Sequence, residues 1–481
     1  MPRAEYRAGC AAYTEGLSRA WLIPPLLILY TLHLGGVGFL GPDEPRYASA
    51  GREMARSGDL ITPRLDGQPW FEKPPLLYWM IAGGHWAGLP GEWAARLPVA
   101  LASVAFLVFY YRSLAREFSQ ELALTASAIL ATSAGWITYS FAALTDLGMS
   151  AALGASVLIA LYGTREGSGW VAGAFLGVSI LGKGLVPVAL FAPLLLFVPG
   201  RRVAIAAGAL AVAAPWHLWS LALNGGAFWD DYFWKQHVAR FFTPALEHVQ
   251  PFWFYVPVLL AALFPWTPLA ALLARPGVYA DVRVRLLGAW AAYGLLFFSI
   301  SRNKLPGYIL PLMPALALMM AASLDAARAK KAWLGACAAL LGVLPAVASI
   351  LPGGLLSGIG DVNVIISPSG LLFAAAAACV WWLASKDRQQ AAVLSVALAA
   401  GMGIVYIKYT AFPPLDRGVS VRAFWQANRE AAGRACVGEI RRTWQYGLNY
   451  YAGRVLPPCS VSEAWRPRVE GTQDVLSIAV P

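Results

Sequence analysis

The segment Gly41–Pro75, GPDEPRYASAGREMARSGDLITPRLDGQPWFEKPP, decides how the rest of the chain is interpreted. It follows directly on the first long apolar run and opens with two adjacent carboxylates, Asp43 and Glu44. It carries several more charged side chains and closes with Glu72 and Lys73 before two prolines. Only 13% of the residues are charged, so a loop this charged beside an apolar segment predicts a functional site.

The composition indicates an integral membrane protein. Of the 481 residues, 58% are hydrophobic, and the mean hydropathy is +0.56, which favours many membrane-spanning helices over a soluble core. The net charge of +11 could indicate a nucleic-acid partner, but the basic residues are scattered in short clusters between apolar runs. Such clusters are typical of membrane topology and anionic lipid headgroups, so we expect membrane lipid and no nucleic acid as a partner.

Thirteen apolar segments come close to the roughly 20 residues that a helical span needs. The segment 75–89 is rich in Trp and Tyr, has only about 15 residues and is weakened further as a span by Gly83, Gly84 and His85, so we expect it to lie at the membrane interface. This choice places the Arg and Lys clusters of the later loops together on the cytoplasmic side, whereas counting 75–89 as a span would move them all outside. The predicted spans are 21–40, 94–111, 121–141, 147–163, 169–182, 184–199, 203–222, 252–273, 286–300, 308–324, 332–352, 370–385 and 390–410.

The predicted organisation is an all-α polytopic membrane domain with a small appendage. Residues 1–19 form a cytoplasmic N-terminus without a cleavable signal peptide. Residues 20–410 form the membrane domain, whose first loop, 41–93, faces the periplasm. The composition turns polar after 410, and residues 411–481 are predicted to form a small periplasmic α/β domain.

The start of the charged loop predicts a helix. Asp43 stands between two prolines where an N-cap is expected, and Gly58 follows the last helical residue, Ser57. We expect this helix to lie along the membrane surface.

One hypothesis for a charged loop on the outer side of a membrane is the active site of a sugar transferase. Nucleotide sugars are absent outside the cytoplasm, so the donor of such an enzyme would be a lipid-linked sugar phosphate. Such a site needs a carboxylate that activates or orients the acceptor, cations that stabilise the leaving phosphate, and a groove for the polyprenyl chain. The predicted topology places such groups on one side of the membrane. The carboxylates are Asp43, Glu44 and Asp146, and the cations are Arg46, Lys73, Lys183, Arg240 and Lys304.

Several candidate residues also have a simpler interpretation. Asp43 and Asp146 could serve only as caps of the helices that follow them. Lys73 and Lys183 could extend their amines to the membrane surface. His237 could be a hydrogen-bonded loop histidine.

The motifs DEPRYA, EKPPL, EWAARLP and KLPGYILP, in this order, resemble bacterial lipid-carrier-dependent glycosyltransferases of the GT-C class. The resemblance covers roughly residues 20–420 and is nearest to the lipid A aminoarabinose transferases, whose wider superfamily includes protein O-mannosyltransferases. It implies about thirteen transmembrane helices, two interfacial helices in the first loop, and a periplasmic C-terminal domain.

The resemblance also implies an activity. This is the inverting transfer of 4-amino-4-deoxy-L-arabinose, or a similar sugar, from undecaprenyl phosphate to lipid A or another periplasmic acceptor. It is expected of a monomer in the bacterial inner membrane, with its active site facing the periplasm. The resemblance implies Asp43 as the leading catalytic carboxylate and Asp146 as the second. It places five residues near the carrier phosphate: Arg46, Lys73, Lys183, Lys304 and Tyr308. It also implies that Glu72 and His237 bind a divalent metal, zinc or similar, which the activity need not require.

Two alternatives stay open at this point. An enzyme of the same fold could act on a protein or a cell-surface polysaccharide, which only acceptor assays separate from lipid A. A transporter for a lipid-linked sugar would predict inverted repeats and charges in the middle of its helices, and the sequence shows neither.

The five cysteines have no metal-ligand spacing, but their placement predicts one disulfide. Cys10 is expected in the cytoplasm, and Cys337 and Cys379 fall in predicted spans. Cys436 and Cys459 fall in the domain predicted to be periplasmic, where disulfides form and persist.

Overall fold

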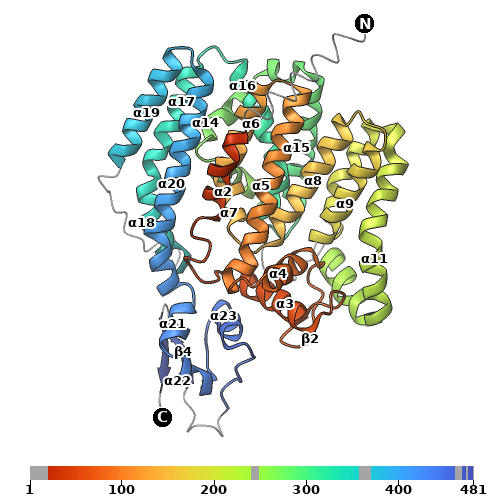
Figure 1. The fold of residues 1–481 in the computed structure, drawn as a ribbon, viewed down its shortest axis with the longest axis vertical. Coiled ribbons are helices and arrows are strands. Elements are labelled where there is room, and N and C mark those ends of the chain that lie inside the picture. Colours follow the sequence, from red (N-terminus) through yellow and green to blue (C-terminus); the bar gives the residue numbers. More distant parts are fainter. Residues whose placement is uncertain (1–19, 240–248, 357–369, 461–467, 473–474, 480–481) are drawn as a thin grey trace.

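The computed structural model describes residues 20–239, 249–356, 370–460, 468–472 and 475–479. It is a bundle of helices with a small mixed α/β unit attached at one end (Figure 1). Among the described residues, seven helices are long and apolar enough to cross a membrane, or up to eight if the bent pair α6–α7 is counted as one span. The architecture is therefore that of a multi-pass membrane protein, while the number of thirteen spans stays a prediction.

The bundle combines long helices with several that are short or broken. The helix pair α6 and α7 is bent by 60° at Ser133, inside one predicted span. The helices of 16 residues or more are α5 (Gly91–Glu117), α8 (Thr145–Tyr162), α9 (Ser168–Lys183), α11 (Arg202–Phe228), α15 (Val282–Ile300), α19 (Gly370–Ser385) and α20 (Gln389–Gly418). The shorter ones are α6 (Gln120–Thr132), α7 (Ala134–Ser140), α10 (Val186–Phe191), η2 (Ala192–Phe197), η4 (Trp229–Ala239), α13 (Tyr255–Ala262), α14 (Thr267–Ala270), η8 (Pro306–Leu312), α16 (Met313–Asp325), α17 (Lys330–Leu340) and α18 (Leu344–Leu356).

The first apolar run does not form the single helix predicted for 21–40. Helix α2 covers only Ile23–Thr31, and the chain then continues to residue 42 without a regular helix. The carbonyls that a helix would have used are bound by the buried Arg96, whose Nη atoms donate to Leu34, Val37 and Gly38 at 2.7–3.0 Å. A buried arginine thus replaces the backbone hydrogen bonds that a continuous helix would have formed.

The charged loop forms two helices joined by a hairpin: α3 (Asp43–Ser57), β1 (Arg64–Leu65), β2 (Gln68–Pro69) and α4 (Leu76–Trp86). Helix α3 ends as predicted at Gly58, which adopts the left-handed conformation with φ 72°. The predicted N-cap was wrong, because the capping position is Pro42 and no side chain caps this helix. Helix α4 has 11 residues, which is too short to cross a membrane, as expected for 75–89.

The C-terminal unit has the predicted α/β character. It contains α21 (Arg422–Ala427), α22 (Arg429–Arg434), β3 (Cys436–Val437), α23 (Arg442–Ala452), β4 (Arg468–Thr472) and β5 (Val475–Ala479). Strand β4 is central, parallel to β3 and antiparallel to β5. The predicted disulfide between Cys436 and Cys459 is confirmed.

Helix α20 connects this unit to the bundle. The helix continues beyond the predicted boundary at 410 to Gly418, through Pro413 and Pro414. Polar contacts then hold the unit against the bundle: Arg422 donates to the carbonyl of Gly35 at 2.7 Å, and the Tyr451 hydroxyl donates to Glu92 at 2.7 Å. The unit therefore lies at the same end of the bundle as α3 and α4 (Figure 1).

Candidate active site

A network of charges joins the start of α3 to the segment before α4. Arg46 pairs with Asp43 three residues earlier in the first turn of α3, and it pairs with Glu72 at 2.8 Å. Glu72 also accepts from Lys73 at 3.2 Å. The side chain of Asp43 is 38% exposed, whereas that of Arg46 is only 10% exposed. Asp43 is thus the open end of a network that is otherwise buried.

Arg46 is fixed from several sides. Its guanidinium lies 5.4 Å from the ring centroid of Trp70 and 5.2 Å from that of Tyr446. Burial alone would lower the pKa of Arg46, but Glu72 and Asp43 outweigh it, and the net shift is upward. Tyr446 belongs to α23, so the C-terminal unit contributes directly to the site. Nothing in the spacing of the sequence indicated this contact.

A second ion pair joins α8 to the end of α9. Lys183 donates to Asp146, which stands in the first turn of α8. The Lys183 amine also lies 4.5 Å from the ring centroid of Tyr308. The chain passes Asp146 closely at Gly307, where a Cβ atom would lie 2.7 Å from the carboxylate oxygen. Only glycine therefore fits here without moving Asp146, and this explains the glycine of the KLPGY motif.

The two ion-paired groups face one region of the molecule. Asp43 and Asp146 both act electrostatically on the hydroxyl of Tyr139 in α7, as does Tyr308. Four elements remote in sequence, α3, α7, α8 and η8, thus bring their polar groups together at the end of the bundle near α4.

A cavity of about 290 Å³ opens beside these groups. Its polar end is lined by Glu72, Lys73, Lys183 and Tyr308. Its walls are apolar and come mainly from α10 and α15, with Leu185, Val186, Ala189, Phe297 and Phe298 among the lining residues. A cationic end on an apolar groove fits a molecule with an anionic head and a hydrocarbon tail.

The simpler interpretations of four residues do not match these contacts. Neither Asp43 nor Asp146 caps its helix with a side-chain hydrogen bond. Lys73 is 9% exposed, and the Lys183 side chain is 11% exposed. Both amines bind carboxylates, so neither extends to the surface as a solvated group.

Glu44 lies apart from this site. It forms a buried ion pair with Arg96, whose Nη2 and Nε atoms donate to the two carboxylate oxygens at 2.8 and 2.9 Å. The same oxygens accept from the backbone amides of Leu40 and Ala143. A helix turns about 100° per residue, so adjacent carboxylates point in different directions. We therefore assign Glu44 to folding and not to the reaction.

Of the predicted cations that the structure describes, Arg46 and Lys304 do not line the cavity. Lys304 is buried, and its amine donates to the carbonyls of Gln250 and Ser301. Burial lowers the pKa of Lys304. Its neighbours Ser301 and Asn303 line the cavity, so Lys304 holds the loop that closes the cavity. Arg240 lies outside the described residues.

The predicted metal site of Glu72 and His237 stays a prediction, because the structure describes only one of the two side chains. Both oxygens of Glu72 are occupied by cations, Arg46 and Lys73. The side chain of His237 lies outside the description, and the described residues hold no group of three or more His, Cys, Asp or Glu side chains that could bind a metal. No step of the reaction is therefore assigned to a metal ion.

Comparisons with known proteins give this arrangement a family context. Residues 72–219 match the family described as dolichyl-phosphate-mannose-protein mannosyltransferase. The undecaprenyl phosphate-alpha-4-amino-4-deoxy-L-arabinose arabinosyl transferase of Pectobacterium carotovorum is 35% identical over 322 residues, and that of Pseudomonas aeruginosa is 32% identical over 312. The chain is similar to these transferases over part of its length. Each alignment covers 61% of this chain and 57% of the relative, so the chain matches somewhat more than half of their length.

The fold agrees with this relationship. The crystal structure of ArnT from Cupriavidus metallidurans bound to undecaprenyl phosphate superposes with a TM-score of 0.72 and 23% identity, covering 91% of this chain and 85% of ArnT. The apo form of that protein gives the same TM-score at 24% identity. The chain therefore shares the fold of ArnT, and the predicted multi-pass membrane architecture agrees with the apolar helices of the structure.

Proposed function

We propose that the protein is an integral membrane glycosyltransferase that moves a sugar from undecaprenyl phosphate to an acceptor on the periplasmic side of the inner membrane. The observation that carries this proposal is the cavity with a cationic end and apolar walls, beside a partly exposed carboxylate. The names of the relatives, which are transferases of 4-amino-4-deoxy-L-arabinose, support an aminopentose or similar sugar. The proposed acceptor is lipid A or another phosphorylated glycolipid.

In the proposed reaction, an acceptor oxygen attacks the anomeric carbon of the sugar from the side opposite the phosphate. The bond between that carbon and the phosphate oxygen breaks, and the polyprenyl phosphate leaves with the electron pair. One direct displacement inverts the anomeric configuration.

Lys73 and Lys183 are placed to stabilise the leaving phosphate. Both line the polar end of the cavity, and a buried cation directed at a developing negative charge lowers the barrier more than it would in water. Tyr308, which packs against the Lys183 amine, would donate its hydroxyl to the same phosphate. The apolar walls from α10 and α15 would hold the first isoprene units.

Asp43 is the proposed catalytic carboxylate. Arg46 and Glu72 fix its position, while its own side chain stays partly exposed. With a hydroxyl acceptor, Asp43 would take the proton as the new bond forms. With an ionised phosphate acceptor there is no proton to take, and Asp43 would orient the acceptor. Asp146, paired with Lys183, would fix the position of that amine.

The proposed orientation rests on two observations. The Cys436–Cys459 disulfide lies in the C-terminal unit, and such bonds persist in oxidising compartments. This unit contacts the site through Tyr446, so both belong to the same side of the membrane.

Mass spectrometry of lipid A and surface glycans tests the proposal. Cells that make the polyprenyl-linked sugar should carry the sugar on an acceptor only when the protein is present, and cells with Asp43→Asn should lack it. The proposal would be contradicted if cells that contain the donor and folded wild-type protein had the same lipid A and the same glycans as cells without the protein.

A further inference from the structure

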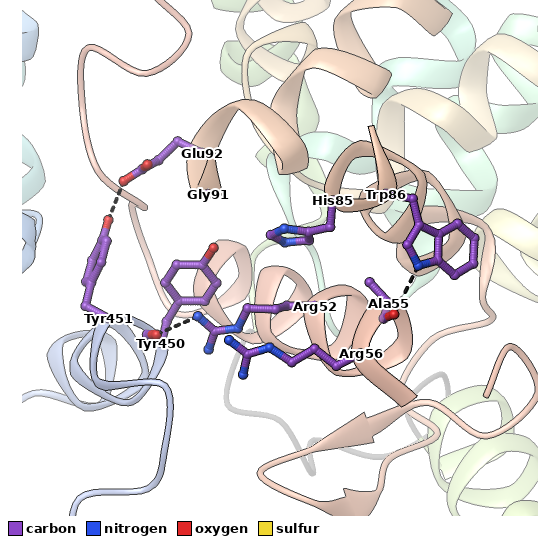
Figure 2. A pocket seen from close by; sticks show the side chains of 9 residues that line it. All are labelled: Arg52, Ala55, Arg56, His85, Trp86, Gly91, Glu92, Tyr450 and Tyr451. Carbon is purple, nitrogen blue, oxygen red and sulfur yellow. Dashed lines mark hydrogen bonds between the residues drawn. The ribbon is translucent and has the colours of Figure 1, made fainter. Parts of the chain in front are cut away.

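A second cavity, of about 500 Å³, lies between the interfacial helices and the C-terminal unit (Figure 2). It is lined from α3, α4, the start of α5 and α23. It shares no residue with the cavity proposed for the donor. Arg52 lies nine residues after Asp43 on α3, which places its backbone about 14 Å further along the helix. The second cavity is therefore separate from the reacting groups.

Two arginines one helical turn apart form the base of this cavity. Arg52 is held in place, because its Nη1 donates to the carbonyl of Tyr450 at 2.8 Å and its guanidinium lies 4.0 Å from the centroid of that ring. Its Nε is buried and has no hydrogen-bond partner in the described structure. Arg56 forms no hydrogen bond or ion pair with any residue that the structure describes, and Figure 2 shows both guanidinium groups pointing toward Tyr450.

The rest of the lining leaves this positive charge uncompensated. His85 faces the arginines from α4, and its Nε2 is buried without a partner among the described residues. Glu92 is the one carboxylate among the residues that line the cavity. Its Oε1 already accepts from the Tyr451 hydroxyl at 2.7 Å and from Arg422 at 3.4 Å. The buried Arg52 Nε is a donor without an acceptor, which is costly, so an anion that accepts from it would be stabilised.

The position of the cavity indicates where the anion comes from. Trp86 lines it, is 58% exposed, and donates its indole N–H to the carbonyl of Ala55 at 3.0 Å. An exposed tryptophan on a short apolar helix is typical of the headgroup region of a membrane. The planar, multiply donating guanidinium groups match the oxygens of a phosphate.

We propose that this cavity binds a phosphate group on the headgroup of a membrane lipid, through Arg52 and Arg56, as a second lipid site. The phosphate could belong to the acceptor glycolipid or to bulk anionic phospholipid. Only the assignment to the acceptor rests on the proposed function. The existence of the site does not.

Direct binding to the purified full-length protein in neutral detergent tests this site without any need for turnover. The probes are phosphatidic acid, a bisphosphorylated diglucosamine lipid, and a neutral diacylglycerol. Arg56→Gln removes a guanidinium that holds no other group, so the fold should be unaffected. The matched control is Arg285→Gln, an exposed arginine at the start of α15.

The phosphorylated lipids should bind, the diacylglycerol should not, and Arg56→Gln should weaken binding roughly tenfold or more, whereas Arg285→Gln should not. Tighter binding of the glycolipid than of phosphatidic acid, lost in Arg56→Gln, identifies the acceptor as the source. Equal binding of the two, lost in the same variant, identifies bulk phospholipid. Wild-type affinity for both lipids in Arg56→Gln would overturn the proposal, whether or not the protein transfers a sugar.

Discussion

The adjacent residues Asp43 and Glu44 should respond in opposite ways when their charge is removed. In Glu44→Gln, the amide keeps the size of the side chain but leaves the Arg96 guanidinium without its counter-charge. Both side chains of this pair are nearly inaccessible, at 3% and 4%. Breaking a buried ion pair on one side costs about 3–5 kcal/mol.

The loss should appear as lower thermal stability. At about 2 cal/mol/K per residue, a chain of this length has an unfolding entropy near 1 kcal/mol/K. The apparent Tm of Glu44→Gln in detergent should therefore fall by roughly 3–5 °C, and the loop that Arg96 holds should become sensitive to protease. The protein that remains folded should keep its specific activity.

Asp43→Asn should behave differently. Asp43 is 38% exposed, and its partner Arg46 retains Glu72, so the Tm should change by no more than about 1 °C. Turnover should fall by at least roughly 100-fold, as for the loss of a group that acts on the transition state. Normal stability of Glu44→Gln combined with lost turnover would refute this division of roles, because Glu44 would then belong to the reaction.

Three further predictions concern the donor site, the C-terminal unit and the metal. Lys183→Met should lower kcat/KM for the donor by roughly 100-fold, measured by donor titration at saturating acceptor; an unchanged donor dependence would remove Lys183 from the phosphate site. Thiol labelling of unreduced, denatured protein should detect three thiols and not five. The double variant Cys436→Ser, Cys459→Ser should destabilise the C-terminal unit by about 3 kcal/mol on the chain-entropy model, as measured by limited proteolysis. Because the carboxylate of Glu72 binds cations, chelators should leave turnover unchanged and elemental analysis should find no bound metal; reversible loss of activity on chelation would contradict this.

The polar site could be predicted largely from the sequence, because its residues are charges in a chain that is otherwise apolar. Lys73 and Lys183 were identified as candidates from their position at the ends of apolar runs, and the structure places both beside one cavity. The pairing of Asp146 with Lys183 could not be predicted, since it depends on how the start of α8 packs beside the end of α9.

Adjacency in sequence was misleading for Glu44. Two neighbouring carboxylates had the same chemistry in the sequence, but the helix leaves Asp43 partly exposed beside Arg46 and directs Glu44 into the interior. The signal that could have separated them is Arg96, an arginine inside an apolar segment, which requires a buried partner. Lys408, 1% exposed in α20, is a similar case, since its amine binds the carbonyl of Leu32 beyond the end of α2.

The helix boundaries failed where local composition and tertiary contacts disagree. The run 21–40 is apolar enough for a span, yet Gly35, Gly36 and Gly38 weaken the helix, and Arg96 binds the backbone in its place. The polar composition after 410 suggested the end of the last span, but α20 continues through Pro413 and Pro414 to Gly418. The contact between Tyr446 and Arg46 joins two distant parts of the chain, and no periodicity predicts it.

The central claim is that the cavity lined by Lys73 and Lys183 uses a polyprenyl-phosphate sugar as donor. Its most direct test incubates the purified protein with an undecaprenyl-phosphate aminopentose and a phosphorylated glycolipid acceptor. Mass spectrometry then measures the undecaprenyl phosphate that is released and the acceptor that is glycosylated. We predict that release matches the formation of glycosylated acceptor one to one in the wild type and is lost in Asp43→Asn of unchanged Tm. The account would be contradicted if wild type and Asp43→Asn released undecaprenyl phosphate equally. It would also be contradicted if folded wild-type protein released none with any phosphorylated glycolipid, protein or polysaccharide acceptor.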